Sequence, residues 1–358
     1  MAESMQLLLP LLTQERAADY RICCGAHNYL LKPEEPDDGR SSSLECDRIN
    51  DTWRLKMTDW AYDVVDQFSV DREAVAVALN YVDRFMVFHC ENNEATLVTK
   101  RIFQLLTLTS LYLAIKLHGS ISYHKNGART KPTLQVFVEM SENRFTTAVI
   151  EQMEFQLLTK LKWRLNPPLS VNFVYYLLDL LPNWVTTDGV HGSYRRMRSA
   201  IYEVSRYMIE TSICVSDFTF LFMPSAIGFA AILAALDALE QDPALSNIFP
   251  PSEVLLDFFQ NVFDATSLRP TMEDIKKARS MLVDICPAVF SAHHVYSRSP
   301  ATVTIHSDTQ CSSSSTPCTG ECGEETGSEE AASSPTCTEI VHDLEEHFIH
   351  PLGEARPR

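Results

Sequence analysis

The sequence predicts an all-α fold made of two tandem five-helix units, followed by a flexible, acidic C-terminal tail. Apolar residues recur at helical spacing through residues 51–288, and two segments that are apolar all round each fall third in a set of five. No segment alternates apolar and polar residues as a half-buried strand does. With 45% apolar and 22% charged residues, the composition is that of a folded globular chain. A core of packed helices is therefore expected.

The first unit is predicted over residues 51–168. Trp53, Met57 and Trp60 lie on one stripe of an amphipathic helix that runs to about residue 68. The segment 102–117 is almost wholly apolar, which is typical of a central, buried helix. A Pro-Pro pair ends the unit. The other three helices are expected at about residues 75–86, 134–138 and 145–161.

The second unit is predicted over residues 169–288, and its third helix begins at Pro224. This helix overlaps Phe218–Leu236, nineteen uncharged residues that meet the length criterion for a membrane span. The internal proline and the acidic flanks favour a helix buried in protein, and no membrane association is expected. The five helices of this unit are expected at about residues 172–181, 194–210, 224–239, 252–263 and 271–283.

The two ends of the chain differ in composition from these units. Residues 1–50 are predicted to form a partly flexible lead, and residues 289–358 a disordered tail rich in Ser, Thr and Glu. Of the net charge of −17, residues 297–358 carry −8, so nucleic acid is not an expected partner. The apolar residues between Ile340 and Phe348 allow a short docked helix, although a loosely tethered end is preferred.

No catalytic, cofactor or metal signature is found in the sequence, which has no nucleotide-binding loop, zinc-protease or nucleophile motif. Asp63 and Asp66 are spaced as a carboxylate pair, but residues in this position usually form a solvated helix face. Cys318 and Cys322 lack the second pair that a zinc site needs. We therefore expect neither cofactor nor metal. The scattered cysteines suit reduced thiols in the nucleus and cytoplasm.

Four charged residues occupy positions where the helical pattern predicts burial or half-burial: Arg54, Asp83, Lys116 and Glu154. A buried charge is retained only when a partner offsets its desolvation. Arg54 and Asp83 are expected to form a structural salt bridge between the first two helices. Lys116 and Glu154 either pair in the same way or face the backbone of an external partner.

These residues belong to segments that together resemble the cyclin box, over about residues 53–170. The resemblance includes Arg54–Trp60 and Asn80–Met86, followed by Leu113–Lys116, Met153-Glu154 and Trp163–Pro167. The positions that define the box are filled by Arg54, Asp83, Leu105, Lys116 and Glu154. The chain looks most similar to the divergent cyclins of diatoms and related algae. The second unit resembles the C-terminal cyclin fold only in helix order and in Pro224-Ser225.

The resemblance implies that the chain is no enzyme but the activating subunit of a cyclin-dependent kinase, controlling cell-cycle progression. In the family, the residues matching Lys116 and Glu154 hydrogen-bond to kinase backbone beside the N-terminus of the kinase C-helix. Leu117, Leu158 and Leu165 match positions that supply apolar contact area. The docked C-helix would then complete the kinase active site. A transcriptional cyclin or a cyclin-fold transcription factor is the alternative, and an α-helical enzyme is disfavoured for lack of a catalytic constellation.

A second surface follows from the resemblance. Cyclins bind their kinase substrates at a docking patch, which here would comprise Met57, Trp60 and Gln104, although core packing explains Met57 and Trp60 equally well. Lys56 replaces an apolar member of this patch, so the docking of Arg-x-Leu peptides is expected to be weak. His118-Gly119 stands where cyclins usually carry an acidic pair after the lysine, which affects the choice of kinase.

The tail is predicted to control turnover. Ser299, Thr316 and Ser334 each precede a proline and are candidates for phosphorylation. Phosphorylation would add charge to a flexible segment that a ubiquitin ligase could read. This predicts a short-lived protein.

Overall fold

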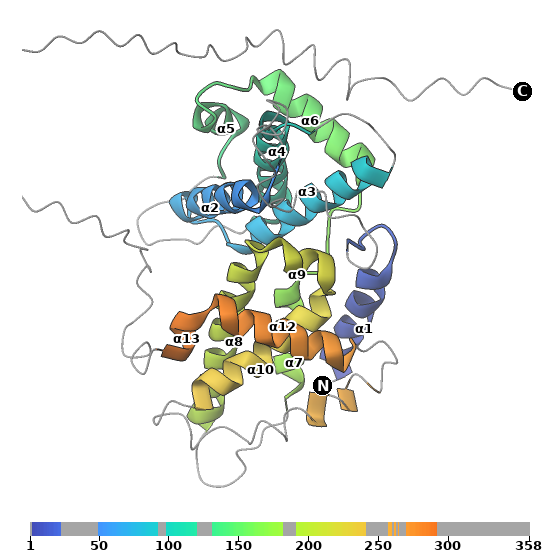
Figure 1. The fold of residues 1–358 in the computed structure, drawn as a ribbon, viewed down its shortest axis with the longest axis vertical. Helices are drawn as coiled ribbons and strands as arrows, with labels where there is room; N and C mark the ends of the chain where they lie inside the picture. The colour runs from blue at the N-terminus through green and yellow to red at the C-terminus, as the bar shows by residue number, and fades with distance from the viewer. Residues whose placement is uncertain are drawn as a thin grey trace, which may run out of the picture. The chain divides into compact units, whose positions relative to one another are not determined.

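The computed structural model describes residues 2–22, 49–91, 98–119, 131–181, 191–240, 257–259, 261, 262, 264 and 270–291. The chain divides into two units, residues 1–293 and 294–358, and every described residue lies in the first. All the regular elements among the described residues are helices, so the all-α prediction is confirmed (Figure 1). The division of residues 51–288 into two domains remains a prediction.

The first group of helices surrounds α4 (Lys100–His118), which contacts all four of its neighbours in this group. These neighbours are α2 (Asp51–Phe68), α3 (Glu73–Glu91), α5 (Leu134–Met140) and α6 (Thr147–Lys160). Most of α4 is buried, as the apolar segment 102–117 predicts. Three of these helices begin at a side chain that accepts a backbone N–H, namely Asn50, Thr99 and Thr146.

The second group surrounds α10 (Pro224–Glu240), which contacts α7, α8 and α12. The described helices around it are α7 (Ser170–Leu180), α8 (His191–Ile213), α9 (Ser216–Leu221), α12 (Met272–Ile285) and α13 (Pro287–Ser291). Gly228 permits the close approach of α10 to α7, because a Cβ there would lie 2.6 Å from the carbonyl oxygen of Ser170. The helix expected at 252–263 lies largely outside the described residues.

Polar contacts join the two helix groups at the start of α3. Arg72 Nε lies 2.8 Å from a carboxylate oxygen of Glu210 on α8, and its guanidinium lies over the ring of Tyr62 at 4.3 Å. The Tyr62 hydroxyl donates to the Glu210 carbonyl oxygen at 3.1 Å. Asp66 binds the same arginine at 2.5 Å, and Asp63 is exposed.

The described part of the chain contains no helix with the length and apolarity needed to cross a membrane. The uncharged stretch 218–236 is split between α9 and α10, with the break just before Pro224. Its apolar residues are used in packing, since Phe229 to Ala235 are all buried.

The first helix, α1 (Ala2–Arg16), lies within the segment that the sequence predicts as a partly flexible lead. Its residues Leu8 and Leu12 are fully buried, and the helix packs on α7 and α10. Near its end, the Glu15 carboxylate accepts hydrogen bonds from the backbone N–H of Ser225 at 2.9 Å and from its hydroxyl at 2.7 Å. Glu15 thereby satisfies the first turn of α10, where backbone N–H groups lack partners within the helix.

Burial raises the pKa of Glu15 to about 7, even though the bonds from Ser225 act in the opposite direction. In the unfolded chain the pKa of a glutamate is near 4.5. Because the folded state holds this proton more tightly, the contribution of Glu15 to the free energy of unfolding falls as the pH rises from about 4.5 to 7.

Replacing Glu15 by glutamine removes this titration. The free energy of unfolding of Glu15→Gln minus that of the native sequence should increase by about 3 kcal/mol as the pH rises from 4.5 to 8. Urea unfolding at a series of pH values measures the difference. Gln67→Ala, a non-titrating exposed change on α2, should show an effect that does not vary with pH. A difference that is equally constant for Glu15→Gln would contradict the prediction.

Candidate functional site

The site rests on a buried ion pair between α2 and α3. Arg54 is fully buried and Asp83 is 1% exposed. Arg54 Nη2 donates to Asp83 Oδ2 at 2.9 Å, and Nη1 donates to Oδ1, which makes the pair bidentate. Nη2 also lies 3.5 Å from the hydroxyl of Thr219 on α9. The pair that the sequence suggests thus joins two helices of the first group and reaches an element of the second.

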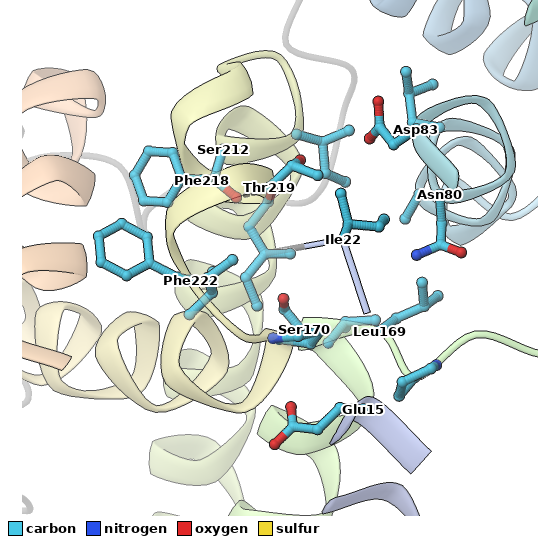
Figure 2. Close-up of a pocket in the computed structure, with 18 of the residues that line it drawn as sticks. Glu15, Ile22, Asn80, Asp83, Leu169, Ser170, Ser212, Phe218, Thr219 and Phe222 are labelled. Atoms are coloured by element: carbon cyan, nitrogen blue, oxygen red, sulfur yellow. Dashed lines mark hydrogen bonds between the residues drawn. The ribbon is translucent and has the colours of Figure 1, made fainter. Parts of the chain in front are cut away.

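A cavity of about 100 Å³ lies beside this pair. Figure 2 shows Asn80 and Asp83 of α3 on one side of it and Phe218, Thr219 and Phe222 on another. Small-molecule pockets usually have volumes of about 300 to 1,000 Å³, so this cavity is too small for such a ligand. We therefore treat the ion pair and the cavity as structural. The described residues also contain no group of His, Cys, Asp and Glu that could hold a metal ion.

Removing one member of the ion pair should be far more damaging than removing both. Arg54→Met leaves the Asp83 carboxylate buried without its cation, and we expect a loss of about 3–5 kcal/mol in free energy of unfolding. Arg54→Met/Asp83→Leu replaces the pair by apolar side chains and should lose less than either single variant. Urea unfolding of Arg54→Met, Asp83→Leu and the double variant gives the coupling energy between the two residues.

The matched control is Arg144→Met, because Arg144 forms an exposed ion pair with Glu142. Its loss should cost less than about 1 kcal/mol. Additive effects of the two changes at Arg54 and Asp83 would contradict the coupling.

Lys116 and Glu154 form an ion pair between α4 and α6, with 2.8 Å between Nζ and Oε1. The side chain of Lys116 is 49% exposed, and that of Glu154 is 13% exposed. Lys116 is the first residue after the buried part of α4, so its side chain extends beyond the core. The hydrogen bond with Glu154 raises the pKa of the lysine amine. Lys131 Nζ binds the Lys116 carbonyl oxygen at 3.1 Å.

Exposed apolar side chains accompany this pair on α4, α6 and the segment after α6. Leu117, which the resemblance proposes as a contact, is 47% exposed, and Leu158 and Leu165 are half-buried. Phe155 and Trp163 are more exposed than any of these, at 66% and 68%. Neither is among the site residues predicted from the sequence. Phe155 could have been found because it falls outside the buried stripe formed by Met153 and Leu157.

A groove forms where α2 and α4 approach the α5–α6 connection. Met57, Trp60 and Gln104, which the resemblance proposes as a docking patch, all line it, together with Leu108 and Phe145. Its volume is about 170 Å³, which suits side chains of a bound peptide better than a complete small-molecule ligand. Met57 is 9% exposed, so it packs in the core and still reaches the groove.

Lys56 lies at the side of Trp53, with Nζ 5.8 Å from the centre of the ring. Lys100 Nζ lies 5.7 Å from the same ring centre. Two cations, one on α2 and one at the N-terminus of α4, therefore lie next to the ring of Trp53.

Several proposed residues lie outside the described part of the chain. They are the phosphorylation candidates Ser299, Thr316 and Ser334, the segment Ile340–Phe348, and the cysteines of the tail. Their suggested roles in turnover and in recognition by a ubiquitin ligase stay predictions, as does the localisation in nucleus and cytoplasm.

The chain is similar to known proteins over part of its length. Residues 26–166 match the family model of the cyclin N-terminal domain. The chain is 26% identical over 261 residues to the G2/mitotic-specific cyclin-B1 of Oryzias latipes, covering 70% of this chain and 52% of that protein. It is 26% identical over 205 residues to cyclin-D2-2 of Oryza sativa subsp. japonica, covering 56% and 50%. The chain thus spans about half the length of these curated relatives.

Solved structures with similar folds include a viral cyclin from herpesvirus saimiri, with a TM-score of 0.45, 14% identity, and coverage of 66% of this chain and 87% of that one. The CAK complex from Chaetomium thermophilum, bound to ATP-γ-S, contains a chain with a TM-score of 0.45 and 19% identity, covering 81% and 80%.

The matched domain includes the buried Arg54–Asp83 pair and the Lys116–Glu154 pair. Over residues 26–166 the chain is similar to the cyclin N-terminal domain, and it is similar to cyclins of the B and D types. The further resemblance to diatom and algal cyclins remains a prediction.

Proposed function

We propose that this chain is the activating regulatory subunit of a cyclin-dependent kinase and acts in cell-cycle progression. The observation that carries the proposal is the Lys116–Glu154 pair, which stands among exposed apolar side chains. A protein contact surface needs this combination, because aromatic and apolar groups supply buried area and a few polar groups fix the orientation.

The chemistry of the pair suits the recognition of backbone at a helix end. An ammonium group has three N–H donors, and one is used by Glu154. A carboxylate accepts at both oxygens, so Glu154 can take N–H groups from the first turn of a partner helix while it stays paired with Lys116. The lysine can in turn donate to a nearby carbonyl oxygen of the partner. The two residues would bind the kinase C-helix and select its active arrangement.

Phe155 and Trp163 extend the proposed contact beyond the residues taken from the resemblance. Aromatic side chains that lose a large exposed area on binding often contribute most of the affinity. Leu117 lies one residue beyond Lys116, at the end of α4. The kinase-binding surface is therefore defined as Lys116, Leu117, Glu154, Phe155, Leu158, Trp163 and Leu165.

Kinase reconstitution tests this proposal. The chain is purified with candidate cyclin-dependent kinases from its own source, and phosphorylation of a histone substrate is measured. We expect activation by the native sequence and a loss of at least about tenfold for Lys116→Ala/Glu154→Ala, because a partner loses charge-assisted hydrogen bonds. Arg198→Ala/Asp179→Ala, which removes an ion pair between α7 and α8, is the matched control and should activate normally.

The result also separates the alternatives. Binding without activation would indicate a scaffold or an inhibitory cyclin. Failure to bind any of the kinases would contradict the proposal and favour the transcription-factor alternative.

The groove lined by Met57, Trp60 and Gln104 is proposed as the substrate-docking patch of the same complex. Its lining combines apolar side chains such as Trp60 and Phe145 with polar and charged ones, which supports this role, and the lysine at position 56 opposes the docking of a basic peptide. Lys56→Ile removes the like charge and adds apolar area, worth about 1 kcal/mol or fivefold in affinity.

Fluorescence anisotropy with a labelled Arg-x-Leu peptide should therefore show binding that is about fivefold tighter for Lys56→Ile than for the native sequence. Lys276→Ile, an exposed change on α12, is the control and should leave the affinity unchanged. Equal affinities of the native sequence and Lys56→Ile would contradict the assignment of the patch.

A further inference from the structure

The backbone between α6 and α7 contains a strained turn. Lys162 and Trp163 are consecutive residues in the left-handed region, with φ of 51° and 58°. This region is unfavourable for residues other than glycine, and neither residue is one of the types that tolerate it. The turn therefore needs support from its surroundings. The same turn exposes the indole of Trp163.

Two elements of the first helix group support this turn through its carbonyl groups. Arg84 of α3 donates to the carbonyl oxygen of Arg164 at 2.7 Å. The Tyr81 hydroxyl, also of α3, donates to that of Leu165, and His118 Nε2 at the end of α4 lies 2.7 Å from the same oxygen.

The end of α1 and the turn after it provide a second, independent support. Gln14 Nε2 donates to the Asn166 carbonyl oxygen at 2.7 Å. One carboxylate oxygen of Asp19 lies 3.1 Å from Lys162 Nζ, and the other lies 3.7 Å from Arg164 Nε. The hydrogen bond from Lys162 lowers the pKa of this carboxyl. Next to Asp19, the ring of Tyr20 lies under the Arg84 guanidinium at 4.8 Å.

We propose that Gln14 and Asp19 are positioning residues, which hold residues 162–166 in the conformation that presents Trp163 and Leu165 to the kinase. This inference rests on the proposed function, since it assigns a task to the N-terminal helix of the same complex. A surface that is ordered before binding loses less conformational entropy on association, so the N-terminal contacts should increase affinity without touching the partner.

Hydrogen exchange of the full chain, without any kinase, tests the positioning. The amides of Lys162, Trp163 and Arg164 donate to the carbonyl oxygens of Thr159, Leu158 and Leu161, so their exchange reports the order of the turn. We expect Gln14→Ala/Asp19→Asn to raise their exchange rates by about fivefold, with α10 unaffected. The single variants Asp19→Asn and Asp19→Glu are also compared. Because Asp19→Glu keeps the charge, its turn should retain much of the protection from exchange that Asp19→Asn loses.

Glu203→Gln is the matched control, because Glu203 is an exposed acid that, like Asp19, pairs with a basic residue, here Arg206 of the same helix, α8. It should leave the exchange of the turn unchanged. Unchanged exchange in Gln14→Ala/Asp19→Asn would overturn the positioning role, regardless of the affinity measured for the kinase.

Affinity for the kinase is then measured by calorimetry with the same variants. The proposal expects a dissociation constant about tenfold higher for the double variant, about threefold higher for Asp19→Asn, and unchanged for Glu203→Gln. Faster exchange with unchanged affinity would overturn the link to partner binding. Faster exchange in a chain that binds no kinase even with its native sequence would overturn the proposed function while supporting the positioning of the turn.

Discussion

The buried pairing of Arg54 with Asp83 is the constraint on which the rest of the structure depends. Both charges are removed from water, so neither side chain can leave without exposing the other to an apolar core. The pair therefore fixes α2 against α3. On α2, this sets the position of Met57 and Trp60 in the groove. On α3, it sets the positions of Tyr81 and Arg84, which bind the backbone of the turn after α6.

The segment Asn80–Arg84 of α3 contacts several neighbouring elements at once. Tyr81 and Arg84 bind the backbone after α6, while Asp83 binds α2. These three side chains are all buried, and each forms at least one hydrogen bond with a specific partner. The arrangement of the proposed kinase-binding surface is thus determined in the core, by hydrogen bonds that a partner never contacts.

The sequence predicts the helices of the core well because their burial has a clear period. It also suggests the Arg54–Asp83 pair, because buried charges need partners. Three features could not be predicted in this way. The helix α1 contains Pro10, and it is stabilised by α7 and α10, which are distant in the sequence. Lys116 extends out of a buried helix at its last turn. Trp163 is exposed by two left-handed residues, a conformation that no local signal predicts.

The contacts of α1 also have a consequence for biosynthesis. Glu15 and Ser225 are 210 residues apart in the chain. At a translation rate of about 5 to 20 residues per second, roughly 10 to 40 s pass between the synthesis of these two residues. Until α7 and then α10 have been synthesised, Leu8 and Leu12 lack the helices on which α1 packs. The nascent chain therefore exposes these two apolar side chains until both halves of their packing surface have been made.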